Sequence, residues 1–301
     1  MPVNITPPYS FVQYVDASAY PCKAVLALCC LPRLGYRLHC LNISGSIGRN
    51  RSRVTTAGLP LCYLCNAGEE HPIQNIIATT AYWLTRDQVR RLARFSGGVI
   101  NTGRPFRYYR KVFFNNRSKA DILASLQGKT VVDIGCGYTP FVPDSMFRAC
   151  HDAGIPFYGV DPIIKKTMNF KASDAFYTRM TGGSGTLDAN APGVEKAISA
   201  LADDLPFADD SVDVILSNWL ILIWINEEVE LLKIFSEFYR VLKAGGSFNL
   251  YPLPDWHSFQ FKNPQLKALL RQFEINQHFV YAGFNLQYPS CNRVSFTKKG
   301  L

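Results

Sequence analysis

The chain has 301 residues, of which 48% are hydrophobic, 13% aromatic and 18% charged. This composition excludes a disordered or collagen-like chain and supplies enough apolar residues for one large domain with an extension, or for two modest domains. No apolar run approaches the roughly 20 residues that a membrane-spanning helix needs, so we expect no transmembrane helix and no membrane partner. The apolar run at residues 24–31 is followed by no small-residue cleavage site, which disfavours a secretory signal.

The net charge of +9 is unevenly distributed along the chain. Residues 1–128 carry 16 Lys and Arg against 5 Asp and Glu, whereas residues 129–301 carry 16 against 18. A basic N-terminal part favours an anionic partner, such as nucleic acid or a phosphorylated substrate. The alternative is an Arg-rich surface that only contacts solvent.

Nine cysteines, an odd number, indicate reduced thiols and a cytoplasmic location. Cys62 and Cys65 have the spacing of a zinc knuckle, and His39, Cys40 and His71 are candidate further ligands. No second Cys-x-x-Cys pair or closely spaced His pair completes the pattern. Buried thiols are therefore the favoured interpretation, and we predict no metal site.

Residues 1–75 show no periodicity and are interrupted by prolines, so we expect an irregular or poorly ordered segment. Residues 76–128 are predicted to form a helical cap. Its first helix is expected to begin at Thr85, as N-cap, and to end near Phe95.

The second helical stretch of the cap is predicted over residues 107–126. It is expected to be interrupted near Asn115 and Asn116, with Ser118 capping its later half.

Residues 129–301 alternate strands with helices, which predicts parallel βαβ units in one α/β domain. The expected strands are 130–134, 157–160, 212–216, 247–251, 279–284 and 293–297, and the expected helices are 144–153, 227–242 and 264–273. The last two strands are expected to pair antiparallel.

A glycine-rich turn follows the first of these strands, in Asp133-Ile-Gly135-Cys-Gly137. Ligands bind outside the carboxyl ends of the strands in open α/β sheets, and glycines let the backbone approach a ligand closely. The third glycine of a dinucleotide fingerprint is replaced here by Pro140 and Phe141, which disfavours NAD. The carboxylate of Asp133 would attract a cationic ligand rather than a pyrophosphate.

The second strand ends at Asp161, 24 residues after Gly137, which leaves room for one helix. A carboxylate at this position can accept hydrogen bonds from both hydroxyls of a ribose. Together, the turn and Asp161 favour a nucleoside-binding site.

At these motifs the sequence resembles the class I S-adenosylmethionine-dependent methyltransferases, and in particular their type 11-like domain. Two further stretches carry the resemblance, Asp204-Leu-Pro-Phe207 with Asp210-Ser-Val-Asp213, and Glu237-Phe-Tyr-Arg240-Val-Leu-Lys-Ala-Gly-Gly246. The resemblance covers about residues 120–301. It implies a Rossmann-like, doubly wound sheet of seven strands, mostly parallel with an antiparallel last strand, and S-adenosylmethionine as cosubstrate, with S-adenosylhomocysteine as product.

The resemblance also implies roles for individual residues. Gly135, Cys136 and Gly137 would approach the methionine part of the cofactor, Asp133 its ammonium group and Asp161 its ribose. The family's acidic residue for the adenine amine is replaced by Leu201. Either Asp203 takes its place, or the adenine is contacted only by backbone N–H groups near Ala202. Ser217, after the fourth strand, would lie near the sulfonium.

Methyl transfer from a sulfonium requires chiefly that the acceptor lie about 3–3.5 Å from the methyl carbon. A base is needed where the acceptor must first lose a proton, and His257 is the candidate. The apolar stretch 219–225 favours a small hydrophobic acceptor, although a buried segment explains it equally well. We therefore predict a methyltransferase acting on a small molecule. The alternatives are a nucleic-acid (RNA) methyltransferase that uses the basic N-terminal part and a non-catalytic S-adenosylmethionine-binding protein.

Overall fold

The computed structural model describes residues 55–56, 72–95, 98, 100–180, 185–282 and 289–300, and the structural statements below concern these residues. The helices are α1 (Pro72–Phe95), α2 (Phe106–Val112), α3 (Lys119–Leu126), α4 (Met146–Asp152), α5 (Ala172–Met180), α6 (Glu228–Val241) and α7 (Pro264–Leu270). The strands are β1 (Thr55–Thr56), β2 (Val131–Ile134), β3 (Phe157–Val160), β4 (Ala197–Ile198), β5 (Val212–Asn218), β6 (Leu242–Leu253), β7 (Phe259–Gln260), β8 (Phe273–Val280) and β9 (Cys291–Lys298).

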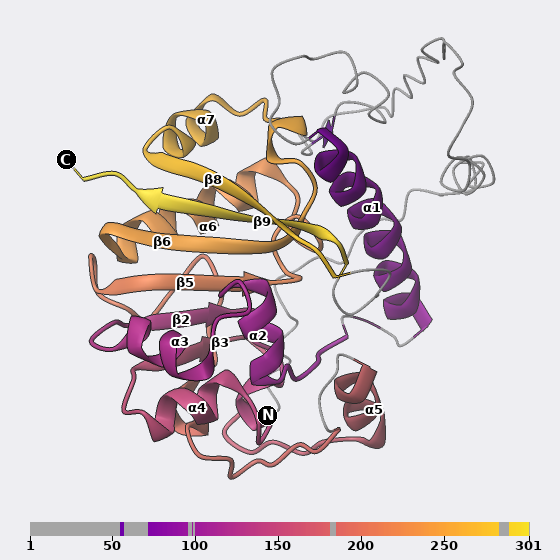
Figure 1. Cartoon of the computed structure of the whole chain (residues 1–301), viewed down its shortest axis with the longest axis vertical. Coiled ribbons are helices and arrows are strands. Elements are labelled where there is room, and N and C mark those ends of the chain that lie inside the picture. Colours follow the sequence, from indigo (N-terminus) through magenta and orange to yellow (C-terminus); the bar gives the residue numbers. More distant parts are fainter. Residues whose placement is uncertain are drawn as a thin grey trace, which may run out of the picture. The chain divides into compact units, whose positions relative to one another are not determined.

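Seven strands form one sheet in the order β4-β3-β2-β5-β6-β9-β8 (Figure 1). The five strands from β4 to β6 are parallel, and β9 is antiparallel to both of its neighbours. The chain passes from β2 to β3 in one direction and from β5 to β6 in the other. The strand order therefore reverses between β2 and β5, where open α/β sheets bind their ligands. The predicted seven-stranded sheet, with its antiparallel last strand, is confirmed.

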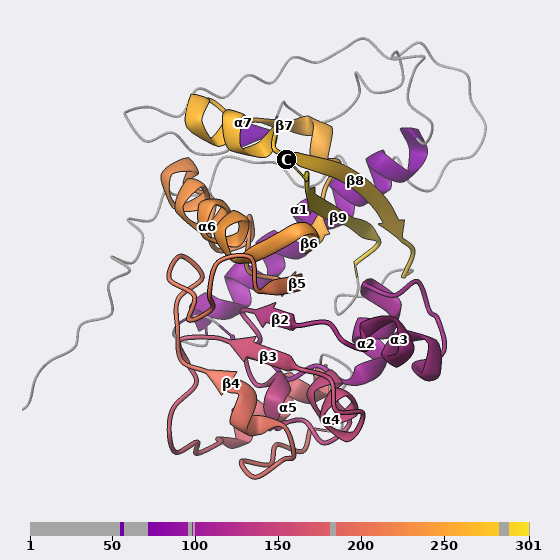
Figure 2. The same cartoon turned by 90° about the vertical axis from the view of Figure 1, so that its left-hand side faces the viewer.

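Helices cover both faces of the sheet, with α6 on one side and α2, α3 and α4 on the other (Figure 2). The sequence of α6 explains its packing, because its buried residues recur with helical spacing at Leu231, Ile234, Phe235, Phe238 and Val241. Phe235 and Phe238 pack against Phe248 of β6, and Phe235 also packs against Phe296 of β9.

Strand β8 differs from the sequence prediction. The structure places it at Phe273–Val280 rather than at 279–284, and α7 ends at Leu270. β8 is the edge strand of the sheet, and its polar residues Glu274, Asn276 and His278 alternate with less exposed ones. Such an edge strand carries little of the apolar pattern that marks a buried strand, so the sequence signal was weak.

The N-terminal helices agree with the sequence in part. Ser118 caps α3 by accepting a hydrogen bond from Asp121 N–H, and Asn115 and Asn116, both with positive φ, separate α2 from α3 as expected. The predicted start at Thr85 was wrong, because α1 already begins at Pro72. Within the helix the Thr85 hydroxyl donates to the carbonyl of Ala81, 2.6 Å away, instead of capping a terminus.

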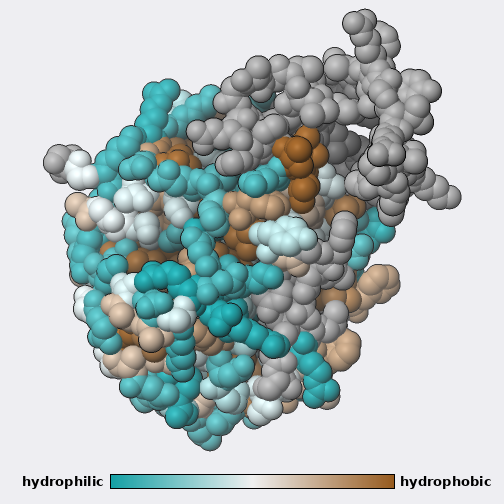
Figure 3. Space-filling view, viewed as in Figure 1, coloured by the Kyte–Doolittle hydropathy of each residue, from teal (hydrophilic) through white to brown (hydrophobic). Residues whose placement is uncertain are grey.

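Helix α1 lies beside the carboxyl ends of the parallel strands (Figure 1). Its Thr79 hydroxyl accepts from Asp255 N–H just after β6, and its Ala78 carbonyl accepts from the Cys291 thiol at the start of β9. The opposite face of α1 leaves large apolar side chains exposed, such as Ile73 (68%) and Phe95 (90%). In Figure 3 brown and tan side chains lie where α1 runs in Figure 1. None of the described helices is both long and apolar enough to cross a membrane.

The boundary predicted between residues 75 and 76 falls in the first turn of α1. Asn75, in this turn, accepts a hydrogen bond from Gln277 Nε2 of β8. Of residues 1–71 the structure describes only Thr55 and Thr56, which form β1 and pair antiparallel with β7. The remainder of the segment predicted to be irregular lies outside the described residues.

Candidate active site

The glycine turn follows β2 at the point where the strand order reverses. Gly135 and Gly137 have φ angles of 72° and 54°, a region that side chains other than glycine rarely adopt. Asp161, at the end of β3, holds this turn, because its Oδ2 accepts from Gly137 N–H and its Oδ1 from Ile163 N–H, each at 2.9 Å. Asp161 is buried in this position.

Asp133 is fully buried at the end of β2. Its Oδ2 accepts a hydrogen bond of 2.5 Å from the hydroxyl of Tyr109 on α2, and its Oδ1 has no hydrogen-bond partner in the described part of the chain. Burial raises the pKa of Asp133 to about 7, although the Tyr109 hydrogen bond and the charge of Arg104 favour the ionised form. The carboxyl group thus has one unused acceptor atom at the switch point.

Strand β5 contributes two more buried polar residues beside Asp133. The hydroxyl of Ser217 and both amide atoms of Asn218 are buried and lack hydrogen-bond partners among the described residues. Buried polar groups without partners cost free energy, so their concentration at one end of the sheet indicates a place where a polar ligand binds.

The loop after β5 is shaped by contacts with the N-terminal helices. Trp219 adopts a positive φ of 59°, and its indole N–H donates to the Tyr108 hydroxyl of α2 at 3.0 Å. The hydroxyl of Tyr82 and the guanidinium of Arg90, both on α1, donate to the carbonyls of Leu222 and Ile223. The apolar stretch 219–225 is thus a loop that α1 and α2 position over the strand ends.

Two groups of the protein itself, one a side chain and the other a backbone carbonyl, lie close to Gly135 and Gly137. A Cβ added at Gly135 would lie 2.9 Å from Cδ2 of Leu220, and one added at Gly137 would lie 2.9 Å from the carbonyl oxygen of Thr102. The Thr102 carbonyl also accepts from Tyr138 N–H. The segment at Thr102 and the loop at Leu220 therefore close the turn from two sides.

Ala202 and Asp203, expected near the adenine, follow β4 on the same sheet edge. The end of β4 adjoins Asp161, whose N–H donates to the carbonyl of Ile198. Ala202 is buried and Asp203 half-buried, in a turn where Leu201 and Asp204 form a β-bridge. The other residues predicted to bind the cofactor lie at the adjacent ends of β2, β3 and β5, as the strand pairings require. They are Asp133, Gly135, Cys136, Gly137, Asp161 and Ser217.

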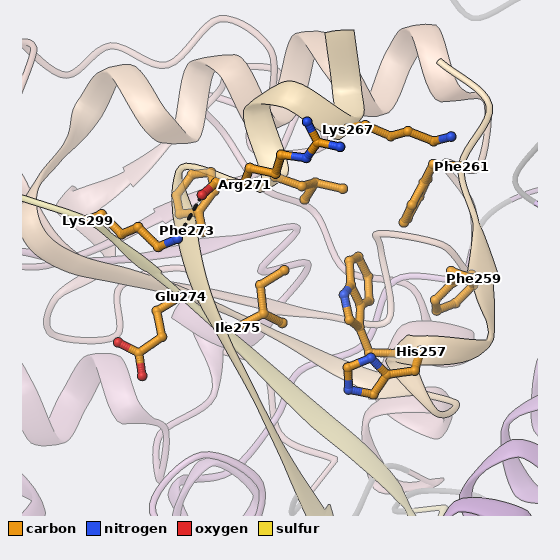
Figure 4. A pocket seen from close by; sticks show the side chains of 11 residues that line it. His257, Phe259, Phe261, Lys267, Arg271, Phe273, Glu274, Ile275 and Lys299 are labelled. Atoms are coloured by element: carbon orange, nitrogen blue, oxygen red, sulfur yellow. Dashed lines mark hydrogen bonds between the residues drawn. The ribbon is translucent and has the colours of Figure 1, made fainter. Parts of the chain in front are cut away.

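His257 lies elsewhere on the surface. It is exposed and lines a pocket with Trp256, Phe259, Arg271 and Ile275, which come from the chain after β6, from the C-cap of α7 and from β8 (Figure 4). No residue of the glycine turn lines that pocket. The structure does not bring His257 together with the residues predicted to bind the cofactor.

Sequence reasoning did not single out Thr102 and Arg104, and it gave Asn218 and Leu220 no role beyond lying in the stretch that follows the fourth strand. They reach the site through folding of the segment before α2 and of the loop after β5. Arg104 stands in Thr-Gly-Arg-Pro, a short turn sequence without periodicity. No pattern in the sequence distinguishes these residues.

The zinc ligands considered from sequence, Cys62, Cys65, His39, Cys40 and His71, lie outside the described residues. Among the residues that are described, no group of three or more His, Cys, Asp or Glu is arranged to hold a metal ion. Cys136, Cys150 and Cys291 are free, buried thiols.

The sheet order and the glycine turn together define a class of protein. Numbered along the chain from β2, the sheet has the order 3-2-1-4-5-7-6, with Asp133 and Asp161 ending its first two strands. This is the arrangement that the resemblance to class I methyltransferases implies. Residues 132–250 match the family model described as "Methyltransferase domain". Residues 132–250 therefore form a class I S-adenosylmethionine-dependent methyltransferase domain, and that match implies S-adenosylmethionine as the cosubstrate.

Two curated proteins of Triticum aestivum are similar to part of the chain. One is "Phosphoethanolamine N-methyltransferase 1", 32% identical over 125 residues, and the other is "Phosphoethanolamine N-methyltransferase", 28% identical over 125 residues. Each match covers 42% of this chain and only 21% of the relative, so the matched stretch spans about a fifth of the relatives' length.

Solved methyltransferase structures also resemble the chain at low identity. A SAM-dependent methyltransferase of Methanosarcina mazei is 19% identical and covers 60% of this chain and 97% of its own, with a TM-score of 0.36. A "possible histamine N-methyltransferase" of Thermotoga maritima is 16% identical and covers 72% and 100%, with a TM-score of 0.31.

The described residues fit S-adenosylmethionine in their chemistry. The unused Oδ1 of Asp133 suits an ammonium group, the carboxylate of Asp161 suits ribose hydroxyls, and the orphaned atoms of Ser217 and Asn218 suit further polar groups. The methionine part would lie against Gly135, so the side chain of Leu220 must move aside for it.

Proposed function

We propose that this protein transfers a methyl group from S-adenosylmethionine to a small-molecule acceptor by in-line displacement. The observation that carries the proposal is the juxtaposition of Asp133, the glycine turn and Asp161 at the switch point of the sheet. The match of residues 132–250 to the methyltransferase family supports it. The three free thiols among the described residues favour a reducing, cytoplasmic location.

In this proposal the chain's own residues bind and orient. S-adenosylmethionine supplies a methyl group on a sulfonium, whose positive charge disperses as the methyl leaves. Asp161 holds the ribose and the glycine turn, Asp133 holds the ammonium group, and Ala202 and Asp203 contact the adenine. Ser217 and the loop after β5 lie where the acceptor would approach, and positioning it supplies most of the acceleration.

A small acceptor is supported by two observations. The loop 219–225 is apolar and is held over the strand ends by α1 and α2, and an apolar wall beside the strand ends suits a small hydrophobic acceptor. The partial relatives bear the name of phosphoethanolamine N-methyltransferases, which makes small amines and phosphoethanolamine itself the first acceptors to test.

The experiment has two stages. Calorimetry with S-adenosylhomocysteine first asks whether the protein binds the cosubstrate's product. Labelled S-adenosylmethionine is then incubated with a panel of small amines, phenols and carboxylates, and with total RNA. Label in a small molecule supports the proposal, binding without transfer to any acceptor supports a non-catalytic protein, and no binding contradicts the proposal.

An RNA acceptor is the second candidate, because residues 1–128 carry 16 Lys and Arg against 5 Asp and Glu. Contacts with phosphates release counterions, so RNA binding would weaken steeply as salt rises. Label in RNA, together with that salt dependence, would favour the nucleic-acid reaction over the small-molecule one.

His257 remains a proposed base for acceptors that must lose a proton. If it serves that role, His257→Ala lowers the rate most below the acceptor's own pKa and leaves the affinity for S-adenosylhomocysteine unchanged. An unchanged rate at every pH would assign His257 to the surface pocket alone.

A further inference from the structure

A groove away from the glycine turn is lined by aromatic rings and by cations (Figure 4). It lies between residues 259–262, helix α7 and the start of β8, and we call it the α7 groove. Its main pocket has a volume of about 640 Å³, which is within the range of sites that bind small organic groups. A second pocket adjoins it and shares Phe259, Phe261 and Lys267, so the groove extends beyond a single pocket.

Three aromatic rings form one wall of the α7 groove. Phe259 and Phe261 lie at 29° to each other with their ring centroids 6.0 Å apart. Trp256 packs against both, at 5.3 and 5.4 Å, and is itself buried against Phe296 of the sheet. Phe259 and Phe261 are only half-buried, so each keeps part of its ring in contact with solvent. A ring that is fixed from behind and free in front can stack on a planar ligand group.

Cations outnumber carboxylates in the α7 groove. Its described lining has four cations, Lys262, Lys267, Arg271 and Lys299, against the single carboxylate of Glu274. Lys267 and Arg271 are exposed and one helical turn apart at the end of α7, and no described residue accepts a hydrogen bond from their side chains. The Lys299 Nζ donates to the carbonyl of Arg271 at 2.8 Å, which brings its charge to the same end of the groove. The groove therefore suits an anionic ligand.

The pairing of ring faces with cations decides which anion fits. An acidic peptide meets the cations, but its carboxylate side chains carry no ring that stacks on Phe259 and Phe261. A nucleotide carries both a planar base and a phosphate. Single-stranded nucleic acids bind through bases that stack on aromatic side chains, next to cations that contact the phosphates. In a duplex the bases are already stacked on one another, so their faces are covered.

We propose that the α7 groove binds single-stranded nucleic acid, with bases stacked on Phe259 and Phe261 and phosphates held by Lys267 and Arg271. The two adjoining pockets give room for consecutive nucleotides. None of these residues belongs to the glycine turn or to the strand ends around it, so the inference goes beyond the proposed function. It holds whether the methyl acceptor is a small molecule or RNA.

The first test uses the unmodified chain and fluorescence anisotropy. The probes are an oligoadenylate of about ten nucleotides, as RNA and as DNA, and a chain of the same length that carries sugar phosphates without bases. Because each stacked base adds to the affinity, the oligoadenylate should bind at least about fivefold more tightly than the chain without bases. Whichever oligoadenylate binds more tightly identifies the ligand as RNA or DNA.

The second test compares variants of the groove, each checked by its thermal unfolding midpoint. Phe261→Leu keeps an apolar side chain without the ring face, so it should weaken the binding of oligoadenylate at least about fivefold and leave that of the chain without bases nearly unchanged. Lys267→Gln should weaken the binding of both and reduce the slope of log affinity against log salt by about 0.7, the value for one phosphate contact. Phe176→Leu, an exposed ring on α5, and Lys129→Gln, an exposed cation before β2, are the matched controls and should change neither.

Four results would overturn the inference. They are no binding of any probe, equal affinities for the oligoadenylate and the chain without bases, binding that survives both Phe261→Leu and Lys267→Gln, and displacement of the oligoadenylate by an equal charge of polyglutamate. The third would place the nucleic acid elsewhere, such as on the basic N-terminal part, and the fourth would assign the groove to an acidic protein. If Phe261→Leu does not fold, the comparison of probes on the unmodified chain and the salt slope of Lys267→Gln still decide.

Discussion

At the scale of single residues, the site depends on a carboxyl group that burial has weakened as an acid. Full burial raises the pKa of Asp133 to about 7, and the Tyr109 hydroxyl and Arg104 oppose that rise without cancelling it. Asp133 therefore changes charge near neutral pH, where an ordinary carboxyl group is fully ionised. A cationic ligand group would favour the ionised form, so ligand binding and proton release are coupled at this position.

Binding of S-adenosylhomocysteine should therefore tighten as the pH rises from 5.5 to about 7 and level off above it. Below the pKa of Asp133 a proton must leave before the ammonium can bind, so affinity falls by up to about tenfold per pH unit. Calorimetry across this range measures the effect. Tyr109→Phe removes a hydrogen bond that lowers the pKa of Asp133 and should move the profile to higher pH.

Asp133→Asn provides the check on this pH profile. The variant should bind S-adenosylhomocysteine more weakly and lose the pH dependence. Glu274 has an exposed carboxyl group on the edge strand, so Glu274→Gln should keep the pH profile of the unmodified protein. A profile that persists in Asp133→Asn would mean that another group titrates.

Asp161→Ala should weaken the binding of S-adenosylhomocysteine by roughly tenfold or more, since each charge-assisted hydrogen bond to the ribose contributes about 1.5–3 kcal/mol. The loss of its bonds to Gly137 and Ile163 should also lower the thermal unfolding midpoint. Calorimetry and thermal unfolding separate these two effects.

Cys136→Ala is the control for Asp161→Ala, because Cys136 would contribute through its backbone. Removing its buried thiol should change the affinity much less. An Asp161→Ala variant that folds and binds as tightly as the unmodified protein would show that the end of β3 does not contact the ligand.

At the scale of elements, the loop after β5 decides access to the glycine turn. Leu220 packs on Gly135, and the loop is tied to α1 through the Tyr82 hydroxyl and to α2 through Trp219. A bound methionine chain and the Leu220 side chain cannot occupy the same space. If the methionine part lies against Gly135, as proposed, its binding requires a shift of this side chain or of its loop, and part of the binding free energy is used for that shift.

Leu220→Ala should consequently bind S-adenosylhomocysteine more tightly, by roughly two- to tenfold, because the closed arrangement loses its packing. Leu220 is only half-buried, so the cost in folding stability should be small. Ile225→Ala, in the same loop and equally half-buried, is the matched control for calorimetry. Weaker binding in Leu220→Ala would mean that Leu220 contacts the ligand instead of blocking it.

At the scale of the whole molecule, α1 belongs to the folded domain rather than to a separable extension. It buries Ala78 and Tyr82 and hydrogen-bonds to residues after β6, in β8 and at the start of β9. We expect a chain of residues 72–301 to fold and to be stabilised by S-adenosylhomocysteine. A chain of residues 96–301 should be insoluble or unfold at a clearly lower temperature, because the ends of β6 and β9 lose their cover.

Thermal unfolding of the two truncated chains, with and without S-adenosylhomocysteine, measures this. A chain that starts at residue 76 should unfold at a temperature between those of the other two, since Asn75 and its hydrogen bond with Gln277 are lost. Equal stability of 72–301 and 96–301 would show that α1 is only appended to the sheet.

Several parts of this protein follow local rules that can be recognised in its amino-acid sequence. Alternating strands and helices from residue 129, the glycine turn and the acidic ends of β2 and β3 depend on short-range periodicity and on backbone conformation, so they could be predicted. The apolar spacing in α6 likewise specifies its buried face before any partner is known.

The surroundings of Asp133, by contrast, arise from contacts between segments that are distant in the sequence. Tyr109, Arg104 and Leu220 come from segments up to 116 residues apart in the numbering of the chain, and none carries a motif. The partners of the Asp133 carboxylate, the cover over Gly135 and the docking of α1 depend on which distant segments pack together at the sheet edge. Such long-range packing buries side chains and shifts a pKa to about 7 through desolvation, which no local pattern encodes.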